Sequence, residues 1–329
     1  MTERVAASGI GSWPGTDPRE AVRAVRDLLT DAVPYLPELP RRGAGAEMVG
    51  RAGAMLEGLH VETQPYGWRF VDRPGADEGR AAAYLRQDLD ELAEAYDGWA
   101  GPLKVQVCGP WTLLASVELT RGERSVSDHG ARHDVVGSLA EGVRRHLADV
   151  ERLVPGAQVV LQVDEPALPA VIEGRLPTQS GYGRLRAVDP AEVRDGLRDV
   201  LAAAGERSTA VHCCAPDAPL QLIREAGTGA LAVDLALVGG PVWEVLAEHV
   251  ESGGQVWAGA LPTTEDAADF RAVADRLTGP WQRLGLDPAL LGRVTLTPAC
   301  GLAGLTPSSA VRAQRAVVDA ARAIADDLT

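Results

Sequence analysis

The chain has 329 residues, a length that α/β barrels reach as one domain, and it can bury a large core without disulfide bonds. Its net charge of −14 argues against nucleic acid as a partner, because phosphate binding needs a basic surface. It has no apolar run of about 18 residues to span a membrane and no signal-peptide core near its start, so we expect a cytoplasmic protein with no membrane partner. In that reducing compartment its four cysteines are expected to be buried, catalytic or metal-binding.

Short apolar, β-branched runs alternate with longer amphipathic stretches along the whole chain. The expected strands are residues 4–10, 33–39, 103–109, 157–165, 208–213, 230–235, 255–261 and 293–299. The expected helices are residues 17–31, 78–98, 131–152, 189–204, 216–227, 241–251, 264–278 and 306–327. Eight strand–helix pairs predict one (β/α)8 TIM barrel, a single catalytic domain over residues 1–329. A doubly wound open sheet is the alternative, but no G-x-G-x-x-G follows the first run.

The sequence also predicts one irregular strand, two long loops and several helix N-caps. Run 33–39 predicts an irregular strand, because three prolines crowd it. Segments 59–77 and 169–188 are expected to be long loops over one end of the barrel. Candidate N-caps precede several of the expected helices; they are Asp17, Asp189, Asp217 and Thr264.

Ligand-type residues lie near the ends of the expected strands, where working residues are found in barrels of this kind. His212 and Cys214 are two positions apart and share one face of the chain, whereas Cys213 points the other way. Asp234 ends the sixth strand and Cys300 follows the eighth. Zn²⁺ accepts nitrogen, thiolate sulfur and carboxylate oxygen in a tetrahedral shell. These residues predict a zinc site at the C-terminal face of the strands.

The alternative for each cysteine is a small buried apolar side chain with no role in chemistry. This alternative is the better interpretation for Cys108 and for Cys213. For His212 and Cys214 the metal site is favoured, because Cys300 gives a second, independent signal at the same end of the fold.

Five motifs resemble the C-terminal catalytic barrel of cobalamin-independent methionine synthase. They are IGSWP (10–14), GPWT (109–112), QVDEPAL (162–168), HCC (212–214) and PACGL (298–302). The matches are collinear over nearly the whole chain. Because full-length members of that family have a second, N-terminal barrel, the chain resembles the short, single-barrel members.

The resemblance implies a zinc-dependent methyltransferase that moves a methyl group to the thiol of homocysteine and makes methionine. Zinc, held by His212, Cys214 and Cys300, would lower the pKa of the substrate thiol, so that a thiolate attacks the methyl group in line. The family's fourth protein ligand is a Glu, where this chain has Asp234. Since Asp is one methylene shorter, either the backbone moves closer or the substrate sulfur and a looser carboxylate complete the shell.

The resemblance also implies how homocysteine is bound. Asp164 would be the catalytic residue and would pair with the substrate's ammonium, and Glu165 would do the same or orient its neighbours. A structural cap before the following proline is the alternative for Asp164. The substrate's carboxylate would be bound by backbone N–H groups and a hydroxyl in a segment that is otherwise an ordinary strand-to-helix turn. The residues of that segment are Ile10, Gly11 and Ser12.

A second homocysteine-binding Glu follows strand 2 in the family. Glu38 is the nearest match in this chain, and Glu47 competes with it because the spacing differs. A plain surface charge is the alternative for either residue.

The methyl donor is the largest departure from the family. The family has an I-H-S-P segment after strand 7, whose His assists proton transfer to the folate leaving group, and this chain has Ala260 there. A methyl-corrinoid, which a partner protein could carry, needs no such acid, so it is a candidate donor beside methyltetrahydrofolate. Trp111 and Thr112 are the residues assigned to the donor, although the family's Trp four positions past that Thr is Ser116 here. Simple packing is the alternative for Trp111.

Three further functions fit parts of the pattern. A related enzyme could methylate another small thiol with the same zinc site. A zinc hydrolase is disfavoured, because a thiolate-rich shell makes zinc a weaker acid for water. A barrel with purely structural zinc is also disfavoured. Structural sites are usually closed by four protein ligands, and one spread over the fifth, sixth and eighth strands at a barrel mouth would be unusual.

Overall fold

The computed structural model describes residues 4–264 and 269–328, built around a seven-stranded parallel sheet in the order β1-β10-β9-β8-β7-β6-β4. Seven of the eight runs predicted as strands form this sheet, and the α/β class is confirmed. The strands are β1 (Ala6–Ala7), β4 (Gly101–Cys108), β6 (Ala157–Asp164), β7 (Ser208–Cys213), β8 (Ala230–Asp234), β9 (Gln255–Leu261) and β10 (Val294–Pro298).

Residues 33–38 link the two edge strands of this sheet, β1 and β4, although no regular strand forms there. The amide of Val33 donates to the carbonyl of Ala7 at 2.9 Å, and the amide of Leu36 donates to the carbonyl of Lys104 at 3.0 Å. Prolines 34 and 37 have no N–H to donate, which interrupts the ladder as the sequence predicts. The sheet therefore curls back on itself in a TIM-barrel-like arrangement.

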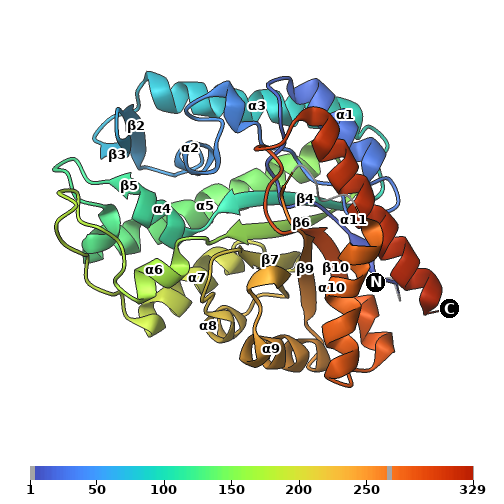
Figure 1. Ribbon diagram of the computed structural model, residues 1–329. Coiled ribbons are helices and arrows are strands. Elements are labelled where there is room, and N and C mark those ends of the chain that lie inside the picture. Colours follow the sequence, from blue (N-terminus) through green and yellow to red (C-terminus); the bar gives the residue numbers. More distant parts are fainter. Residues whose placement is uncertain (1–3, 265–268, 329) are drawn as a thin grey trace.

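Helices surround the sheet (Figure 1). They are α1 (Pro18–Leu28), α2 (Met48–Gly53), α3 (Ala76–Ala95), α4 (Pro110–Ser116), α5 (His129–Leu153), α6 (Leu168–Ile172), α7 (Pro190–Ala202), α8 (Leu220–Glu225), α9 (Gly240–Glu251), α10 (Phe270–Arg283) and α11 (Pro307–Asp327). Short 3-10 helices occupy Pro40–Arg42, Ser125–Ser127, Leu235–Leu237 and Pro288–Arg293. Within the described residues, no helix combines the length and apolar character needed to cross a bilayer.

Two of the four predicted N-caps are confirmed and two are wrong. Asp17 and Asp189 accept hydrogen bonds from the first amides of α1 and α7. Asp217 has φ 62°, outside the extended region that an N-cap needs, and α8 begins after Pro219 instead. The helix expected from Thr264 begins later, with Asp269 as its cap; residues 265–268 lie outside the described part.

The expected loop 59–77 contains a hairpin, so that prediction is wrong. Strands β2 (His60–Gln64) and β3 (Gly67–Val71) pair antiparallel, and β5 (Val117–Glu118) pairs with β3. Alternating β-branched and aromatic residues in this segment were the available signal.

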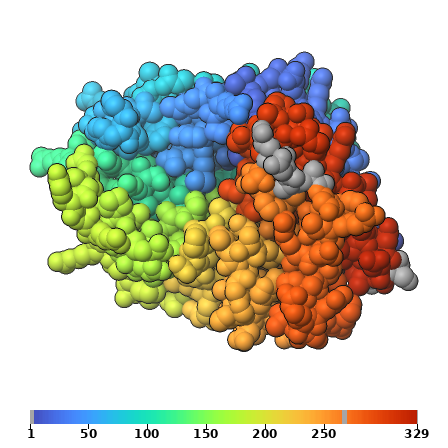
Figure 2. Space-filling view, viewed as in Figure 1, coloured from blue at the N-terminus to red at the C-terminus, as the bar shows by residue number. Residues whose placement is uncertain are grey.

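Segment 169–188 is irregular beyond α6, apart from an isolated bridge. Its Gln179 amide donates to Glu123, and Thr120 donates to the carbonyl of Phe70 at 3.2 Å, so these segments are neighbours. In Figures 1 and 2 the hairpin and segment 169–188 lie toward the same edge of the molecule, at left. The hairpin and segment 169–188 therefore lie beyond the carboxyl ends of β4 and β6.

The barrel interior is distinct from the main core between sheet and helices. Four inward side chains make a small apolar cluster of their own; they are Ala210, Ala230, Ala232 and Trp257. Above them the interior is polar, with Lys104, Gln106 and Gln162 all buried. Polar residues inside a barrel must be paired with one another, and this pairing shapes the site described below.

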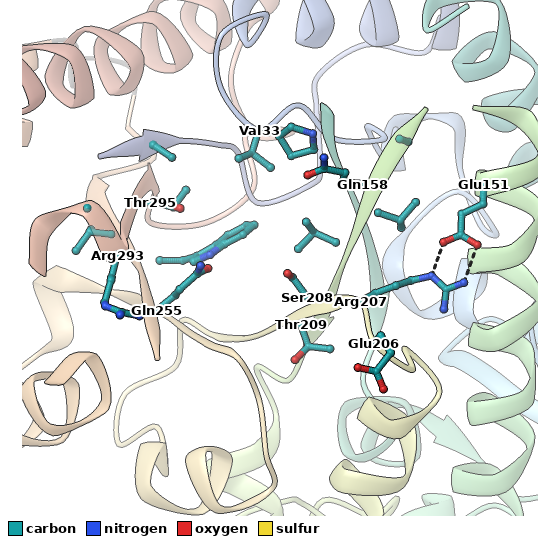
Figure 3. A pocket seen from close by; sticks show the side chains of 18 residues that line it. Val33, Glu151, Gln158, Glu206, Arg207, Ser208, Thr209, Gln255, Arg293 and Thr295 are labelled. Atoms are coloured by element: carbon teal, nitrogen blue, oxygen red, sulfur yellow. Dashed lines mark hydrogen bonds and ion pairs between the residues drawn. The ribbon is translucent and has the colours of Figure 1, made fainter. Parts of the chain in front are cut away.

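A cavity of about 460 Å³ lies at the opposite end of the strands (Figure 3). Residues at or near the starts of strands line it, among them Ser208, Gln255 and Thr295. At its side, Arg207 and Glu151 form an ion pair with two hydrogen bonds. In barrels of this kind the N-terminal end of the strands serves stability, and the chemistry lies at the other end.

Two glycines of α5 provide a direct test of helix packing. A Cβ on Gly142 would collide with the carbonyl oxygen of Met55, whereas a Cβ on Gly137 would meet nothing within 4 Å. We expect Gly142→Ala to lower the free energy of unfolding by about 1–3 kcal/mol, because a packed backbone must move. Gly137→Ala should raise it by up to about 1 kcal/mol, since Ala is the better helix former. Urea unfolding of both variants checks the pair, and equal effects would contradict this packing.

Candidate active site

The carboxyl ends of β6 and β7 bring Asp164 and His212 together. The parallel register pairs these two residues directly. His212 Nδ1 lies 2.9 Å from Asp164 Oδ1, and both side chains are buried. Since an ionised carboxylate only accepts hydrogen bonds, we assign the Nδ1 proton to the histidine.

The other ring nitrogen of His212, Nε2, differs from Nδ1 in its surroundings. Nε2 is buried and has no hydrogen-bond partner among the described residues. Burial opposes the charged imidazolium, but the hydrogen bond to Asp164 and its negative charge outweigh burial and raise the pKa of His212. A buried nitrogen without a partner is costly unless a ligand, metal or water completes it.

Two thiols meet near this histidine. Cys214 Sγ and Cys300 Sγ are 3.6 Å apart, with Cys214 partly buried and Cys300 exposed. The hydrogen bond between them lowers the pKa of Cys300 to about 6 and raises that of Cys214. His212 favours the Cys300 thiolate as well. The thiolate form is therefore favoured at Cys300 and disfavoured at Cys214.

The other two cysteines are apolar core residues. Cys213 belongs to the main core outside the barrel, away from Cys214, and burial raises its pKa to about 12. Cys108 is also fully buried, and burial raises its pKa.

Asp234 is held in a different contact. Its Oδ1 accepts from the amide of Ala236 at 2.8 Å and caps the short helix Leu235–Leu237. Over residues 4–264 and 269–328, no three His, Cys, Asp or Glu side chains are grouped as a ready metal site. The predicted four-residue zinc shell therefore stays a prediction.

The donor set nevertheless suits zinc. Two thiolates on one tetrahedral zinc, each about 2.3 Å from the metal, lie about 3.8 Å apart, close to the 3.6 Å between Cys214 and Cys300. Nε2 of His212, which has no hydrogen-bond partner in the described part of the chain, would supply the nitrogen ligand. Asp234 would have to leave its cap to join them.

Of the two glutamates considered after strand 2, only Glu38 faces the barrel interior. Its Oε1 lies 3.3 Å from Gln106 Nε2 and 3.6 Å from the guanidinium of Arg51, and burial raises its pKa to about 7. Glu47 instead caps α2 and accepts from the indole N–H of Trp68 at 2.5 Å. Glu38 is therefore the one placed among the polar residues of the barrel.

The segment Ile10–Ser12 lies against the loop that carries Cys300. The carbonyl of Ser12 accepts from the amide of Leu302 at 2.8 Å, and a Cβ on Gly301 would collide with Ser12 Oγ. The amide of Glu38 donates to the carbonyl of Gly11 at 3.0 Å. Glycine next to Cys300 thus lets the first and last strands end side by side.

Glu165, Trp111 and Thr112 have internal partners. Glu165 is fully buried and accepts from the amides of Trp111 and Thr112 at 2.9 and 2.8 Å and from the Thr112 hydroxyl at 2.7 Å. Burial raises its pKa to about 7, against these hydrogen bonds. Trp111 is 1% exposed and donates to the carbonyl of Val193 in α7. These contacts fix α4 to the barrel and leave Trp111 in the packing between helices.

Glu165→Gln should destabilise the protein. Glutamine has one acceptor oxygen, so its NH₂ group would face a backbone amide at the start of α4. We expect the free energy of unfolding to fall by about 1–3 kcal/mol, the cost of a buried donor without a partner. Thermal or urea unfolding above the wild-type pKa of about 7 measures it, with the exposed Glu206→Gln as control. Equal stability of the two variants would show that Glu165 does not hold α4.

Sequence reasoning missed the polar residues inside the barrel. Lys104 and Gln106 of β4, and Gln162 of β6, are buried and hydrogen-bonded to the site. Their signal was the polar–apolar alternation within LKVQV and LQVD, which places polar residues on the face opposite the helices. Arg51, 2% exposed and paired with Asp88, had no such signal.

Comparison with known proteins agrees with this geometry. The model of the family described as cobalamin-independent synthase, catalytic domain, matches residues 5–323. A solved structure of a B12-independent methionine synthase from Shewanella sp. W3-18-1, in complex with selenomethionine, is 14% identical with a TM-score of 0.65 over 99% of both chains. A putative sugar phosphate isomerase/epimerase from Anabaena variabilis ATCC 29413 is 12% identical with a TM-score of 0.46 over 98% of both chains, too weak a likeness for inference. No curated protein matches the chain.

The fold is therefore a TIM-barrel-like α/β fold, with polar residues at the carboxyl ends of the strands. The chain belongs to the cobalamin-independent synthase family, as the motifs predicted. Membership implies a methyltransferase of the methionine synthase type.

Proposed function

We propose that this chain, as a single catalytic domain, transfers a methyl group to the thiol of homocysteine in a zinc-dependent reaction that makes methionine. The observation that carries the proposal is the thiol pair of Cys214 and Cys300, whose sulfurs are 3.6 Å apart. Near them lies the buried His212, whose Nε2 has no hydrogen-bond partner within residues 4–264 and 269–328. Zinc bound by these residues would lower the pKa of a bound substrate thiol. Asp234 is the candidate for a fourth ligand.

Asp164 has two tasks in this proposal. Its Oδ1 accepts from His212 Nδ1 at 2.9 Å and from Gln162 at 2.7 Å, so it orients the histidine. Its negative charge, close to the mouth, would also attract the substrate's ammonium. Glu38 is buried nearby and would add to that attraction when ionised.

Ile10, Gly11 and Ser12 are proposed to bind the substrate's carboxylate. Their support is their position, since the carbonyl of Ser12 is bonded to the loop after Cys300. A carboxylate at this point would place the thiol of a short amino acid within reach of the paired sulfurs. Glu165 supports this arrangement indirectly, because its carboxylate is bonded to α4.

The donor is proposed to be methyltetrahydrofolate or a methyl-corrinoid, the latter on a carrier protein. Ala260 is buried and its side chain has no proton to give to an amine leaving group. That favours a leaving group that needs no protonation. Thr112 donates its hydroxyl to Glu165 and Trp111 is buried, so their roles in donor binding rest on the motif alone.

One assay tests the proposal. Zinc-loaded protein is incubated with homocysteine and, in separate reactions, methyltetrahydrofolate, its polyglutamate or methylcobalamin, and methionine is followed. Methionine formed with any donor supports the proposal. Failure of every donor with homocysteine, together with turnover of a different small thiol, would overturn the assignment of the substrate. Failure to bind zinc would overturn the proposed mechanism.

A further inference from the structure

The only lysine of the chain lies inside the barrel. Lys104, in the middle of β4, is 0% exposed. Its Nζ donates to the carbonyl of Ile10 at 2.5 Å and to Gln162 Oε1 at 2.7 Å. It also lies 5.0 Å from the ring centroid of Tyr35 and 5.8 Å from that of Trp257. A buried ammonium with so defined a set of partners is costly to retain, which points to a task.

A chain of hydrogen bonds connects this ammonium to the mouth of the barrel. Gln162 Nε2 donates to Asp164 Oδ1 at 2.7 Å and to the carbonyl of Ile10 at 2.8 Å. Asp164 Oδ1 also lies 2.9 Å from His212 Nδ1. Lysine, glutamine, aspartate and histidine thus follow one another across β4, β6 and β7.

The donors and acceptors of these side chains allow the series of hydrogen bonds to run in only one direction. An ammonium has donors and no acceptor, so Gln162 must turn its oxygen toward Lys104 and its NH₂ toward Asp164. The carboxylate then accepts from Gln162 and from His212, so the histidine carries its proton on Nδ1. Nε2 is left with its lone pair directed away from Asp164.

We propose that Lys104 is a positioning residue, which fixes the direction of the hydrogen-bond chain through Gln162 and Asp164 and so presents His212 Nε2 as a ligand. This inference rests on the proposed function in one respect, that Nε2 binds the metal. Lys104 also holds the carbonyl of Ile10, so one ammonium positions both the histidine and the segment Ile10–Ser12.

The charges around Lys104 agree with this role. Asp164 and Glu38 are the carboxylates that favour its charged form, and burial opposes it, lowering the pKa of Lys104 to about 7. When protonated, Lys104 is a counter-charge for these two buried acids. Loss of it would leave Gln162 Oε1 without a donor and Asp164 without a nearby cation.

Lys104→Met keeps the length of the side chain and removes both charge and donor. In metal-free protein with ¹⁵N-labelled histidine, followed by NMR over a range of pH, the neutral imidazole of His212 in the wild type should carry its proton on Nδ1. The variant should show a mixture of the two tautomers. Zinc affinity, measured by competition with a chelator, should fall about 10- to 100-fold, as for other residues that orient a metal-bound histidine.

Gln162→Met is the second variant and covers the case in which Lys104→Met fails to fold. It retains the ammonium and its bond to Ile10 but breaks the connection to Asp164. It should give the same mixture of tautomers and the same loss of zinc affinity. Lys104→Gln, which has an NH₂ donor but no charge, should recover part of the wild-type tautomer signal.

Unchanged tautomer and zinc affinity in a folded Lys104→Met or Gln162→Met variant would overturn the inference. The two proposals fail in different ways. If wild-type protein binds no zinc while the tautomer still depends on Lys104, the proposed function is wrong and the positioning role stands. If zinc binds and methionine is formed but the tautomer ignores Lys104, only the positioning role is wrong.

Discussion

Cys300→Ser is expected to remove zinc and methyl transfer together. Serine has no sulfur and cannot supply a thiolate to the metal. If structural zinc is bound with about 10–16 kcal/mol shared among four ligands, one ligand is worth roughly 3 kcal/mol, or about 100-fold in zinc affinity. Metal content after gel filtration and methionine formation from homocysteine measure the two effects.

Cys213→Ala is the matched control for this variant. Cys213 is next to Cys214 in sequence but belongs to the core outside the barrel. It should keep zinc and activity, at a modest cost in stability. Full activity of Cys300→Ser after loss of its metal would contradict the proposed role of zinc. Loss of zinc in Cys213→Ala alone would place the zinc site on the outer face of β7, where Cys213 lies.

Asp164→Asn should lower activity about 10- to 100-fold, the range seen when a residue that orients a metal-binding histidine is changed. Asparagine can still accept from His212, so zinc should be retained better than activity. The negative charge proposed to attract the substrate's ammonium is lost, and the KM for homocysteine should therefore rise. Steady-state kinetics at saturating donor separates KM from kcat.

Asp234→Asn is the companion variant, and it tests whether Asp234 is the fourth ligand of the metal. Asp234 caps the helix Leu235–Leu237, and asparagine is an equally good N-cap, so stability should change little. If Asp234 stays in its cap during the reaction, activity should also change little. A loss of zinc in Asp234→Asn would instead assign Asp234 to the metal. An unchanged KM in Asp164→Asn would argue that the substrate's ammonium lies elsewhere.

The pattern of the sequence predicted the barrel well because parallel strands are buried on both faces and stand out as apolar runs. It also predicted that prolines 34 and 37 would disturb the second strand, which survives as isolated bridges. The hairpin His60–Val71 was missed because its strands are half exposed and contain polar residues. Asp217 failed as a cap because its backbone is left-handed, a property of the loop that the residue type does not reveal.

At the site, spacing in the sequence predicted that His212 and Cys214 share a face. The contact between His212 and Asp164 depends on the register of β6 and β7, which no local pattern specifies. The same holds for Glu165, whose carboxylate is bonded to α4 across the barrel rim. The roles of residues that depend on contacts between strands follow from the structure and could not be predicted from the sequence.

The burial of Lys104 has a practical consequence for labelling. Reagents that attack lysine side chains find no accessible target on the folded chain, because Lys104 is its one lysine and is fully buried. Acylation of Lys104 requires the barrel to open, so its rate would report the opening of the whole sheet from a single natural position.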